Sequence, residues 1–140
     1  MMPARVAALF LCGFVAACTP TTIAWPPNDG CAAPPVDETL AIGTTIDRFG
    51  GEDGTFFSPR GEPYRSRSMP HACERLPYRV YRVARPLPVR RCMATPWFGA
   101  PGGAVTLKTT RSAGALVSDG TLVVVSTVRG DRGEATPQCE

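Results

Sequence analysis

The sequence has almost no lysine, almost no histidine and no hydrophobic run long enough to cross a bilayer as a helix. Lys108 is the only lysine among 140 residues, and His71 is the only histidine. Because zinc sites need several spaced cysteine and histidine ligands, and His71 has only Cys73 nearby, we predict no metal site. The longest apolar stretch covers only residues 6–17, whereas a transmembrane helix needs about 20 residues.

The basic charge of the chain is carried by arginine. Nine arginines fall between Arg60 and Arg91, where Glu62 and Glu74 are the only acidic residues. One interpretation is a set of solvated side chains. The other is an anionic ligand, since a guanidinium group can hold two phosphate oxygens at once. The formal net charge of +3 is low and the segment matches no nucleic-acid-binding motif, so we expect no nucleic-acid partner.

The N-terminus has the form of a bacterial secretion signal. Arg5 gives residues 1–17 a positive start, and the apolar stretch follows it. The sequence Val15-Ala16-Ala17-Cys18 resembles a lipobox, where the signal is cut before a cysteine that then carries lipid. Ordinary signal-peptidase cleavage after Ala17 is the alternative. We therefore predict a secreted protein of the bacterial cell envelope, anchored to the membrane by lipid on Cys18.

The six cysteines agree with lipidation. Cys12 leaves with the signal, and lipid on Cys18 then leaves an even set that can form two disulfides in an oxidising compartment. If Cys18 stayed free, five thiols would remain and one would lack a partner. The even set allows three pairings, and the sequence does not choose among them. Its members are Cys31, Cys73, Cys92 and Cys139.

The composition predicts one small domain behind a tether. Residues 18–41 are rich in proline and threonine, which is typical of a linker, and residues 42–140 follow as a single domain. The 15 prolines and 14 glycines are spread without a period, which favours a loop-rich fold. We predict an α+β domain that is mainly β, with a mixed or antiparallel sheet, one short helix and disulfide bridges. Pro86 and Pro88 restrict their strand to an edge or an irregular position.

Two segments near the C-terminus have clear secondary-structure signals. Residues 110–120 place Ala113, Leu116 and Val117 on one helical face, between a threonine that can cap the helix and a glycine that can end it. The β-branched run over residues 121–128 predicts a strand, which we expect to be central in the sheet.

Five blocks of residues spread through the middle of the chain form an ordered pattern. They are Ile46–Gly50, Ser58–Tyr64, Arg67–Pro70, Pro86–Val89 and Pro96–Gly103. In this order and spacing they resemble the tuberculosis necrotizing toxin (TNT) family of NAD⁺ glycohydrolases, and the resemblance covers roughly residues 42–128. It implies a mainly-β fold that cleaves NAD⁺ to nicotinamide and ADP-ribose, with NAD⁺ as substrate, no bound cofactor and an immunity protein as a partner.

The resemblance also implies roles for particular residues. Arg48 and Arg67 match functional arginines of the family, and we assign them to catalysis through contacts with phosphate or ribose. A structural salt bridge to Asp47 or Glu52 is the alternative for Arg48. Phe49 is either a stacking surface for the substrate or part of the core.

Three positions depart from the family pattern. Phe56 stands where the family often has tyrosine, Arg79 where it has histidine, and Thr106, followed by Leu107, where it has glutamine. Arg79 and Thr106 remain candidates for the catalytic set and Phe56 for substrate binding, although an arginine cannot accept a proton at neutral pH. The alternative function is therefore a degenerate TNT-like lipoprotein that binds NAD⁺ or another phosphate ligand without turnover.

The last block contains candidate walls for a nicotinamide pocket. Trp97 and Phe98 offer aromatic surface, and Gly102 and Gly103 let backbone N–H groups face a ligand. The alternative is a hydrophobic anchor that seats this loop on the sheet.

Overall fold

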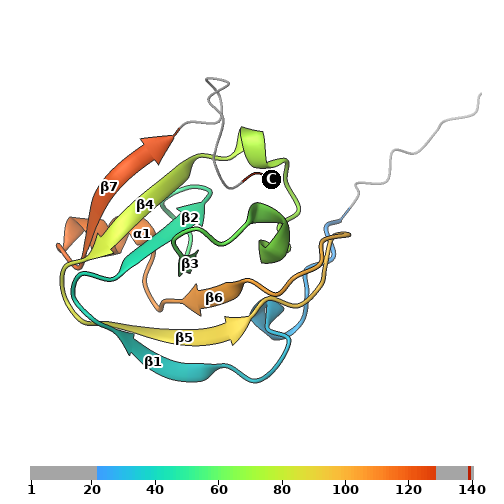
Figure 1. Ribbon diagram of the computed structural model, residues 1–140, viewed down its shortest axis with the longest axis horizontal. Coiled ribbons are helices and arrows are strands. Elements are labelled where there is room, and N and C mark those ends of the chain that lie inside the picture. The colour runs from blue at the N-terminus through green and yellow to red at the C-terminus, as the bar shows by residue number, and fades with distance from the viewer. Residues whose placement is uncertain (1–21, 129–138, 140) are drawn as a thin grey trace, which may run out of the picture.

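The computed structural model describes residues 22–128 and residue 139. Within them, seven strands form one sheet in the order β1-β5-β6-β3-β2-β4-β7, and every pairing is antiparallel (Figure 1). The predicted mainly-β domain with one short helix is therefore confirmed. The strands are β1 (Val36–Leu40), β2 (Thr45–Phe49), β3 (Phe56–Pro59), β4 (Tyr78–Val83), β5 (Leu87–Met93), β6 (Val105–Lys108) and β7 (Leu122–Val128). The helices are α1 (Ala113–Ser118) and the 3-10 turns η1 (Asn28–Gly30), η2 (Tyr64–Arg67) and η3 (Cys73–Arg75).

The sheet divides at β3, which pairs with different strands at its two ends. Phe56 and Phe57 pair with β6, whereas Ser58 and Pro59 pair with β2. The halves β7-β4-β2 and β6-β5-β1 therefore lie on different sides of the molecule (Figure 1). All seven strands and α1 contribute to the core on the face that we call the inner face. This core consists of Leu40, Ile46, Phe57, Tyr81, Val83, Leu87, Val89, Leu107, Ala113, Leu116 and Leu122.

A second, smaller cluster covers the opposite, outer face of β2 and β4. Successive residues of a strand point to opposite faces, so Phe49 and Val80 lie outside while Ile46 and Tyr81 lie inside. The segment that contains η2 and η3 contributes Tyr64 and other residues to this outer cluster. The cluster consists of Phe49, Tyr64, Cys73, Tyr78 and Val80, with Met69, Leu76, Val128 and Cys139 packed against it.

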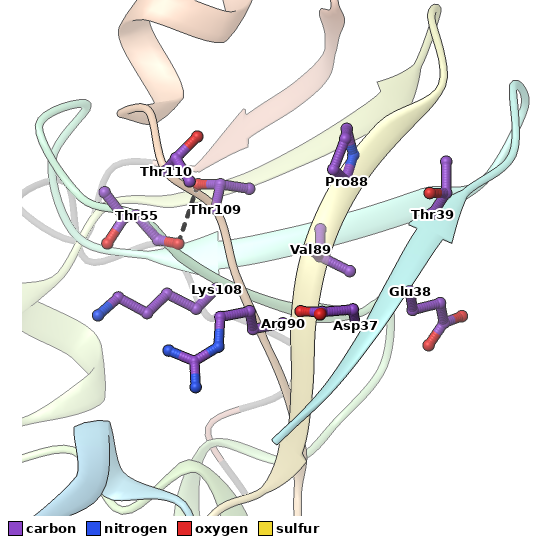
Figure 2. A pocket seen from close by; sticks show the side chains of 10 residues that line it. All are labelled: Asp37, Glu38, Thr39, Thr55, Pro88, Val89, Arg90, Lys108, Thr109 and Thr110. Carbon is purple, nitrogen blue, oxygen red and sulfur yellow. Dashed lines mark hydrogen bonds between the residues drawn. The ribbon is translucent and has the colours of Figure 1, made fainter. Parts of the chain in front are cut away.

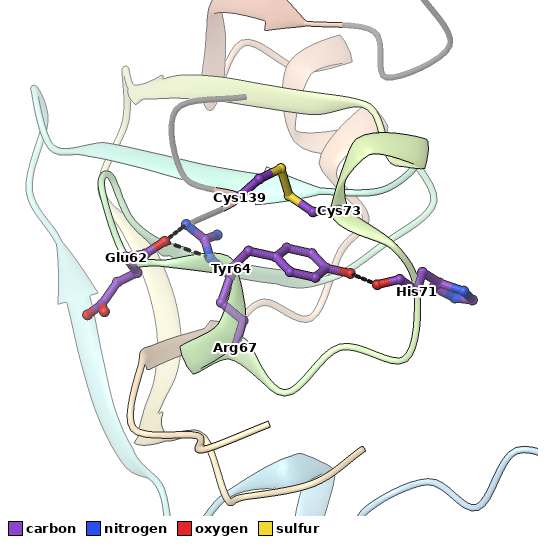
Figure 3. The surroundings of a disulfide bond; sticks show 6 residues. All are labelled: Glu62, Tyr64, Arg67, His71, Cys73 and Cys139. Carbon is purple, nitrogen blue, oxygen red and sulfur yellow. Dashed lines mark hydrogen bonds between the residues drawn. A yellow bond between two sulfur atoms is a disulfide. The ribbon is translucent and has the colours of Figure 1, made fainter. Parts of the chain in front are cut away.

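Two disulfides join distant parts of the chain, as the even set of cysteines predicts. Cys31 bonds to Cys92 and ties the segment before β1 to β5. Cys73 bonds to Cys139 and ties η3 to the C-terminal region (Figure 3). This is one of the three pairings that the sequence allows. Cys92 lies on β5, which contributes to the inner-face core, and the Cys73–Cys139 bridge belongs to the outer cluster.

The N-terminal limit of the domain differs from the sequence prediction. Residues 36–40, assigned above to the tether, form β1, which pairs with β5 along its whole length and buries Leu40 in the core. The last prolines of the tether-like stretch are Pro34 and Pro35, so the composition changes just before this strand. The predicted signal and its lipidation residue Cys18 lie outside the described residues. No helix within residues 22–128 is long and apolar enough to cross a membrane.

The positions of two strands also differ from prediction. β7 is at the edge of the sheet, not at its centre, and Val123, Val124 and Val125 are partly exposed. β5 is an internal strand despite its proline, because Pro88 lies beyond the end of β6. At that position Pro88 pairs only with Thr39 of β1. The N–H group that proline lacks is therefore not needed for a hydrogen bond to β6.

Candidate functional site

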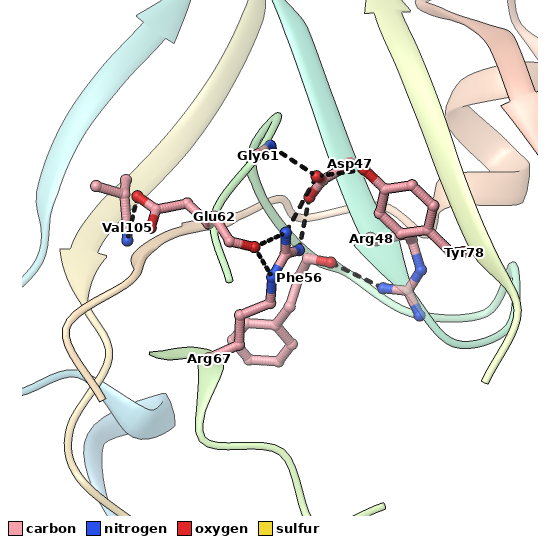
Figure 4. Close-up of polar contacts among 8 residues, drawn as sticks. All are labelled: Asp47, Arg48, Phe56, Gly61, Glu62, Arg67, Tyr78 and Val105. Carbon is pink, nitrogen blue, oxygen red and sulfur yellow. Dashed lines mark hydrogen bonds and ion pairs between the residues drawn. The ribbon is translucent and has the colours of Figure 1, made fainter. Parts of the chain in front are cut away.

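Arg48 lies on β2 and is almost completely buried, with 7% of its surface exposed. Its Nη1 donates a hydrogen bond of 2.8 Å to the carbonyl oxygen of Phe56, the first residue of β3 (Figure 4). A Cβ atom at Gly54 would lie 2.0 Å from Nη2 of Arg48, so only glycine leaves room for the guanidinium group. Burial lowers the pKa of Arg48 because it disfavours the charged form, while Tyr81 and Asp53 oppose the shift. Arg48 therefore holds the start of β3 in place.

Arg79 lies beside Arg48 across the β2–β4 pairing, on the inner face. Its Nη2 is 3.7 Å from Oε1 of the exposed Glu52, and the hydroxyl of Tyr81 is close by. Burial raises the pKa of Tyr81, and the positive charges of Arg79 and Arg48 oppose that shift. Arg48 Nε, Arg79 Nη1 and the Tyr81 hydroxyl are buried without a hydrogen-bond partner in the described part of the chain. These groups keep an unused capacity to bind water or an anion.

Arg67 lies on the outer face and is fully engaged with protein groups. Its Nη1 and Nη2 donate to the two carboxylate oxygens of Asp47 at 2.6 and 3.0 Å. Its Nε and Nη2 also donate to the Glu62 carbonyl oxygen, at 3.0 and 2.6 Å. Only 6% of the Arg67 side chain is exposed, and Asp47 is completely buried. All three nitrogens of its guanidinium group already donate to protein oxygens. Arg67 therefore has a structural role and few donors remain for a ligand.

Asp47 is the centre of a wider polar network on the outer face (Figure 4). Besides Arg67, it accepts hydrogen bonds from the Tyr78 hydroxyl at 2.8 Å and the Gly61 backbone N–H at 3.2 Å. Burial raises the pKa of Tyr78, and the hydrogen bond to the carboxylate raises it further. Phe49 is buried beneath this network with Arg67 over its ring, so the core interpretation of Phe49 fits its position.

Phe56 is the exposed aromatic residue of this region. It is 41% exposed, and its ring lies below the Lys108 ammonium, with 5.4 Å between Nζ and the ring centroid. Phe56 and Lys108 face each other across the β3–β6 pairing, and Thr106 lies two residues before Lys108 on the same face. An open aromatic face beside a cation can stack a flat ring and attract a negative group. In the sequence Lys108 is notable only as the single lysine. Its alternation with Leu107 puts it on the outer face, and the β3–β6 register puts it beside Phe56.

The predicted site residues therefore fall on two faces of the sheet. The outer face holds Phe49, Phe56, Arg67 and Thr106. Along β2 and β3, the outer-face residues Asp47, Phe56 and Ser58 alternate with the core residues Ile46 and Phe57. Arg48 and Arg79 belong to the inner face. The two groups meet at the Phe56 main chain, where Arg48 binds the carbonyl oxygen.

Trp97 and Phe98 contact the N-terminal segment. The Trp97 indole donates to the carbonyl oxygen of Ala24 at 2.7 Å, and the Phe98 ring meets that of Trp25 edge to face at 5.7 Å. These contacts join the loop after β5 to residues 24–25, whereas the second interpretation of this block expected an anchor on the sheet.

Gly102 and Gly103 form the tight turn that follows. Both have positive φ, and a Cβ at Gly102 would lie 2.6 Å from the carbonyl oxygen of Ala94. The Gly103 N–H donates to that same oxygen at 2.9 Å. Glycine at Gly102 is therefore required by the close approach of two backbone segments.

The outer face of β1, β5 and β6 contains an open pocket of about 680 Å³ (Figure 2). Arg90 and Lys108 extend to the same side of it, and threonines line its other end. Among the described residues, no three histidine, cysteine or acidic side chains gather as metal ligands. The lining residues are Asp37, Glu38, Thr39, Thr55, Pro88, Val89, Arg90, Lys108, Thr109 and Thr110.

Fold and motifs together define a small, disulfide-bridged, mainly-β domain of the toxin type. Residues 39–125 match the family described as Tuberculosis necrotizing toxin. The chain belongs to this family.

Two relatives extend the comparison. The conidial surface nicotinamide adenine dinucleotide glycohydrolase nadA of Aspergillus fumigatus is 33% identical over 114 residues, which are 72% of this chain and 49% of that protein. The chain thus spans about half the length of this curated relative. The tuberculosis necrotizing toxin, solved in complex with its immunity factor IFT, has a similar fold, with a TM-score of 0.61 at 23% identity. That likeness covers 71% of this chain and 60% of the toxin chain.

Proposed function

We propose that the protein is an NAD⁺ glycohydrolase whose nicotinamide site is the exposed face of Phe56. The observation that carries the proposal is the pairing of an exposed aromatic ring with a buried arginine that fixes its main chain. Phe56 is 41% exposed, and Arg48 holds its carbonyl oxygen at 2.8 Å. The glycohydrolase nadA, 33% identical over 114 residues, supports NAD⁺ as the substrate.

The chemistry needs little proton transfer from the protein. The bond between ribose C1′ and the nicotinamide nitrogen breaks, and its electron pair returns to the positively charged pyridinium nitrogen. Nicotinamide therefore leaves as a neutral molecule and needs no general acid. Water then attacks C1′ and releases a proton to solvent, which yields ADP-ribose. An arginine at position 79, unable to accept a proton, is compatible with this sequence of steps.

In this proposal the residues share three tasks. Phe56 stacks the nicotinamide ring, and Thr106 offers a hydroxyl on the same face. Arg48 acts through the Phe56 main chain and is a positioning residue. Arg79 lies beside Arg48 on the inner face and adds positive potential behind the proposed site. The reaction as written uses no metal or cofactor.

The test is nicotinamide release from NAD⁺ by the purified, oxidised protein. Arg48→Lys keeps the charge but removes the planar donor fork that reaches Phe56, so we expect the rate to fall at least tenfold. Arg82→Lys is the matched control, because Arg82 is an exposed arginine on β4. If the wild type, Arg48→Lys and the Arg82→Lys control all released nicotinamide at the same rate, Arg48 would not be part of the site. No release by the wild type would refute the proposed activity.

The second candidate is a protein that binds NAD⁺ or another phosphate ligand without cleaving it. It is favoured by the inner-face cluster, where Arg48 and Arg79 have buried donors without partners in the described residues. These are groups for binding an anion, not for moving a proton. Calorimetric binding of NAD⁺ with no nicotinamide release would establish this candidate, and absence of binding would exclude it.

We also propose that the protein works outside the cytoplasm, with lipid on Cys18 as its membrane anchor, and that an immunity protein restrains it. The Cys31–Cys92 and Cys73–Cys139 disulfides support an oxidising compartment. The similar fold of a toxin solved with its immunity factor supports a partner of that kind. Mass spectrometry of the mature N-terminus tests the anchor, since an unmodified Cys18 would exclude it.

A further inference from the structure

A row of side chains crosses four strands on the outer face of the sheet. Asp37 on β1 faces Arg90 on β5, Arg90 faces Lys108 on β6, and Lys108 faces Phe56 on β3. Because facing residues point to the same side of a sheet, the four side chains form one line. Neighbouring strands lie about 4.8 Å apart, so the row is about 14 Å long. It begins at the proposed nicotinamide site and ends in the open pocket.

The two cations of this row are available to a ligand. Arg90 is exposed and makes no ion pair or hydrogen bond within the described residues. Lys108 is paired with Asp29 at 2.8 Å, but both side chains are partly exposed, at 33% and 45%. An exposed pair of this kind contributes little, so a doubly charged pyrophosphate can compete with Asp29 for the ammonium group.

The far end of the row has acceptors suited to a ribose. The Asp37 carboxylate lies beside Arg90 in the pocket, and the lining includes Thr39 and Thr110 (Figure 2). A carboxylate can accept hydrogen bonds from ribose hydroxyls, as acidic residues do in many dinucleotide sites. The order of groups is therefore aromatic ring, ammonium, guanidinium and carboxylate. An extended dinucleotide presents a pyridine ring, a first ribose, two phosphates and a second ribose in that order, so its ring, phosphates and second ribose can meet these four groups in turn.

We propose that the outer-face row Phe56–Lys108–Arg90–Asp37 binds the length of a dinucleotide, with its adenosine end in the open pocket. Lys108 holds the phosphate on the nicotinamide side, and Arg90 holds the phosphate on the adenosine side. Asp37 accepts from the adenosine ribose. This inference rests on the proposed function for its nicotinamide end, whereas its phosphate and ribose contacts can be tested separately.

The first test measures binding of ADP by calorimetry, which needs no turnover. Arg90→Ala removes a charged contact to phosphate, so we expect the Kd for ADP to rise roughly tenfold. Arg91→Ala is the matched control. It removes the same charge from the next residue of β5, which points to the other face and lies 3.4 Å from Glu38. The control should leave the Kd within about twofold of the wild type. Equal Kd values for Arg90→Ala and Arg91→Ala, or no binding of ADP by the wild type, would overturn the inference.

The second test uses the order of the row, with NAD⁺ and nicotinamide mononucleotide as substrates. The mononucleotide lacks the adenosine and its phosphate. Arg90→Ala should therefore raise KM for NAD⁺ roughly tenfold and leave KM for the mononucleotide unchanged, whereas Lys108→Ala should raise both. An Arg90→Ala variant that affects both substrates equally contradicts the assigned order. A wild type that binds ADP in the expected manner but releases no nicotinamide refutes the proposed function and leaves the phosphate site intact.

Discussion

Asp47 and Arg67 lie 20 residues apart in the chain and meet as a bidentate pair, with hydrogen bonds of 2.6 and 3.0 Å. The pair joins β2 to η2 on the outer face, above the buried ring of Phe49. Arg67 also binds the Glu62 carbonyl oxygen, while the Glu62 side chain accepts from the Val105 N–H at 3.2 Å. This network therefore connects β2, η2 and β6, and two of these elements, β2 and β6, also contact Phe56.

The buried pair gives the first prediction, which concerns stability. Asp47→Asn leaves the Arg67 guanidinium buried without a counter-charge, so we expect the free energy of unfolding to fall by about 3 kcal/mol or more. Urea unfolding of the oxidised protein measures this. Glu38→Gln, at an exposed ion pair with Arg91, should change the stability by less than about 1 kcal/mol. A similar small effect for Asp47→Asn would show that the pair contributes nothing in solution.

The second prediction concerns alkaline pH. The folded state raises the pKa of Tyr78 above its ordinary value of about 10, through burial and the hydrogen bond to Asp47. The folded protein thus keeps the phenol proton when the unfolded chain begins to lose it. Stability is fully present below about pH 10 and falls as the pH rises above it, by at most about 1.4 kcal/mol per pH unit for this group.

Tyr78→Phe isolates this contribution. The variant should be less stable than the wild type at pH 8, because it loses a hydrogen bond to a charged acceptor, which is worth about 1.5–3 kcal/mol. Its stability should also decline less steeply between pH 9.5 and pH 11, as judged from urea midpoints. Parallel curves for the two proteins would contradict a raised pKa at Tyr78.

The third prediction concerns the space that Gly54 leaves for Arg48. A methyl group at Gly54 would lie 2.0 Å from the Arg48 guanidinium, so Gly54→Ala should displace it from the Phe56 carbonyl oxygen. We expect nicotinamide release to fall at least tenfold, with a loss of stability of about 1–3 kcal/mol. Gly51→Ala is the control in the same loop. Its methyl group meets only the exposed Asp53 carboxylate, at 2.9 Å, which can rotate away. Equal rates for both variants would show that Arg48 does not position Phe56.

The fourth prediction concerns the departure from the family pattern at Arg79. Arg79→His restores the residue type of the family and removes a positive charge facing Arg48. Because the proposed steps need no general acid or base from the protein, we expect nicotinamide release to change little. A general acid–base group that took part in the reaction would instead raise the rate by about 100-fold or more. Such a gain would follow the protonation of an imidazole and therefore depend on pH near 6.5. A rate that is unchanged, or changed without this pH dependence, would show that the reaction needs no proton transfer there.

Local patterns in the sequence predicted much of the fold. The apolar spacing of Ala113, Leu116 and Val117 indicated α1, which runs from Ala113 to Ser118 with Gly120 just beyond its end. The even set of cysteines indicated two disulfides, which the structure contains. These features depend on neighbouring residues or on counts, which a single sequence records directly.

Features that depend on distant residues were harder to predict. The run from Leu122 to Val128 has the composition of a central strand, but the sheet order places β7 at an edge. The partner of Asp47 is Arg67, 20 residues away, and no local rule relates the two. The site is a similar case, because strand alternation places Lys108 beside Phe56 only once the β3–β6 register is known. Pairing order and register are tertiary properties.

The two disulfides have a consequence for an encounter with proteases. Cys31–Cys92 and Cys73–Cys139 close loops that overlap, since Cys73 lies inside the first and Cys92 inside the second. A single cut of the backbone at any point between residues 31 and 139 therefore leaves both fragments joined by at least one bridge. One nick cannot release a piece of the domain. While the bridges remain oxidised, a protease must cut more than once to take the protein apart.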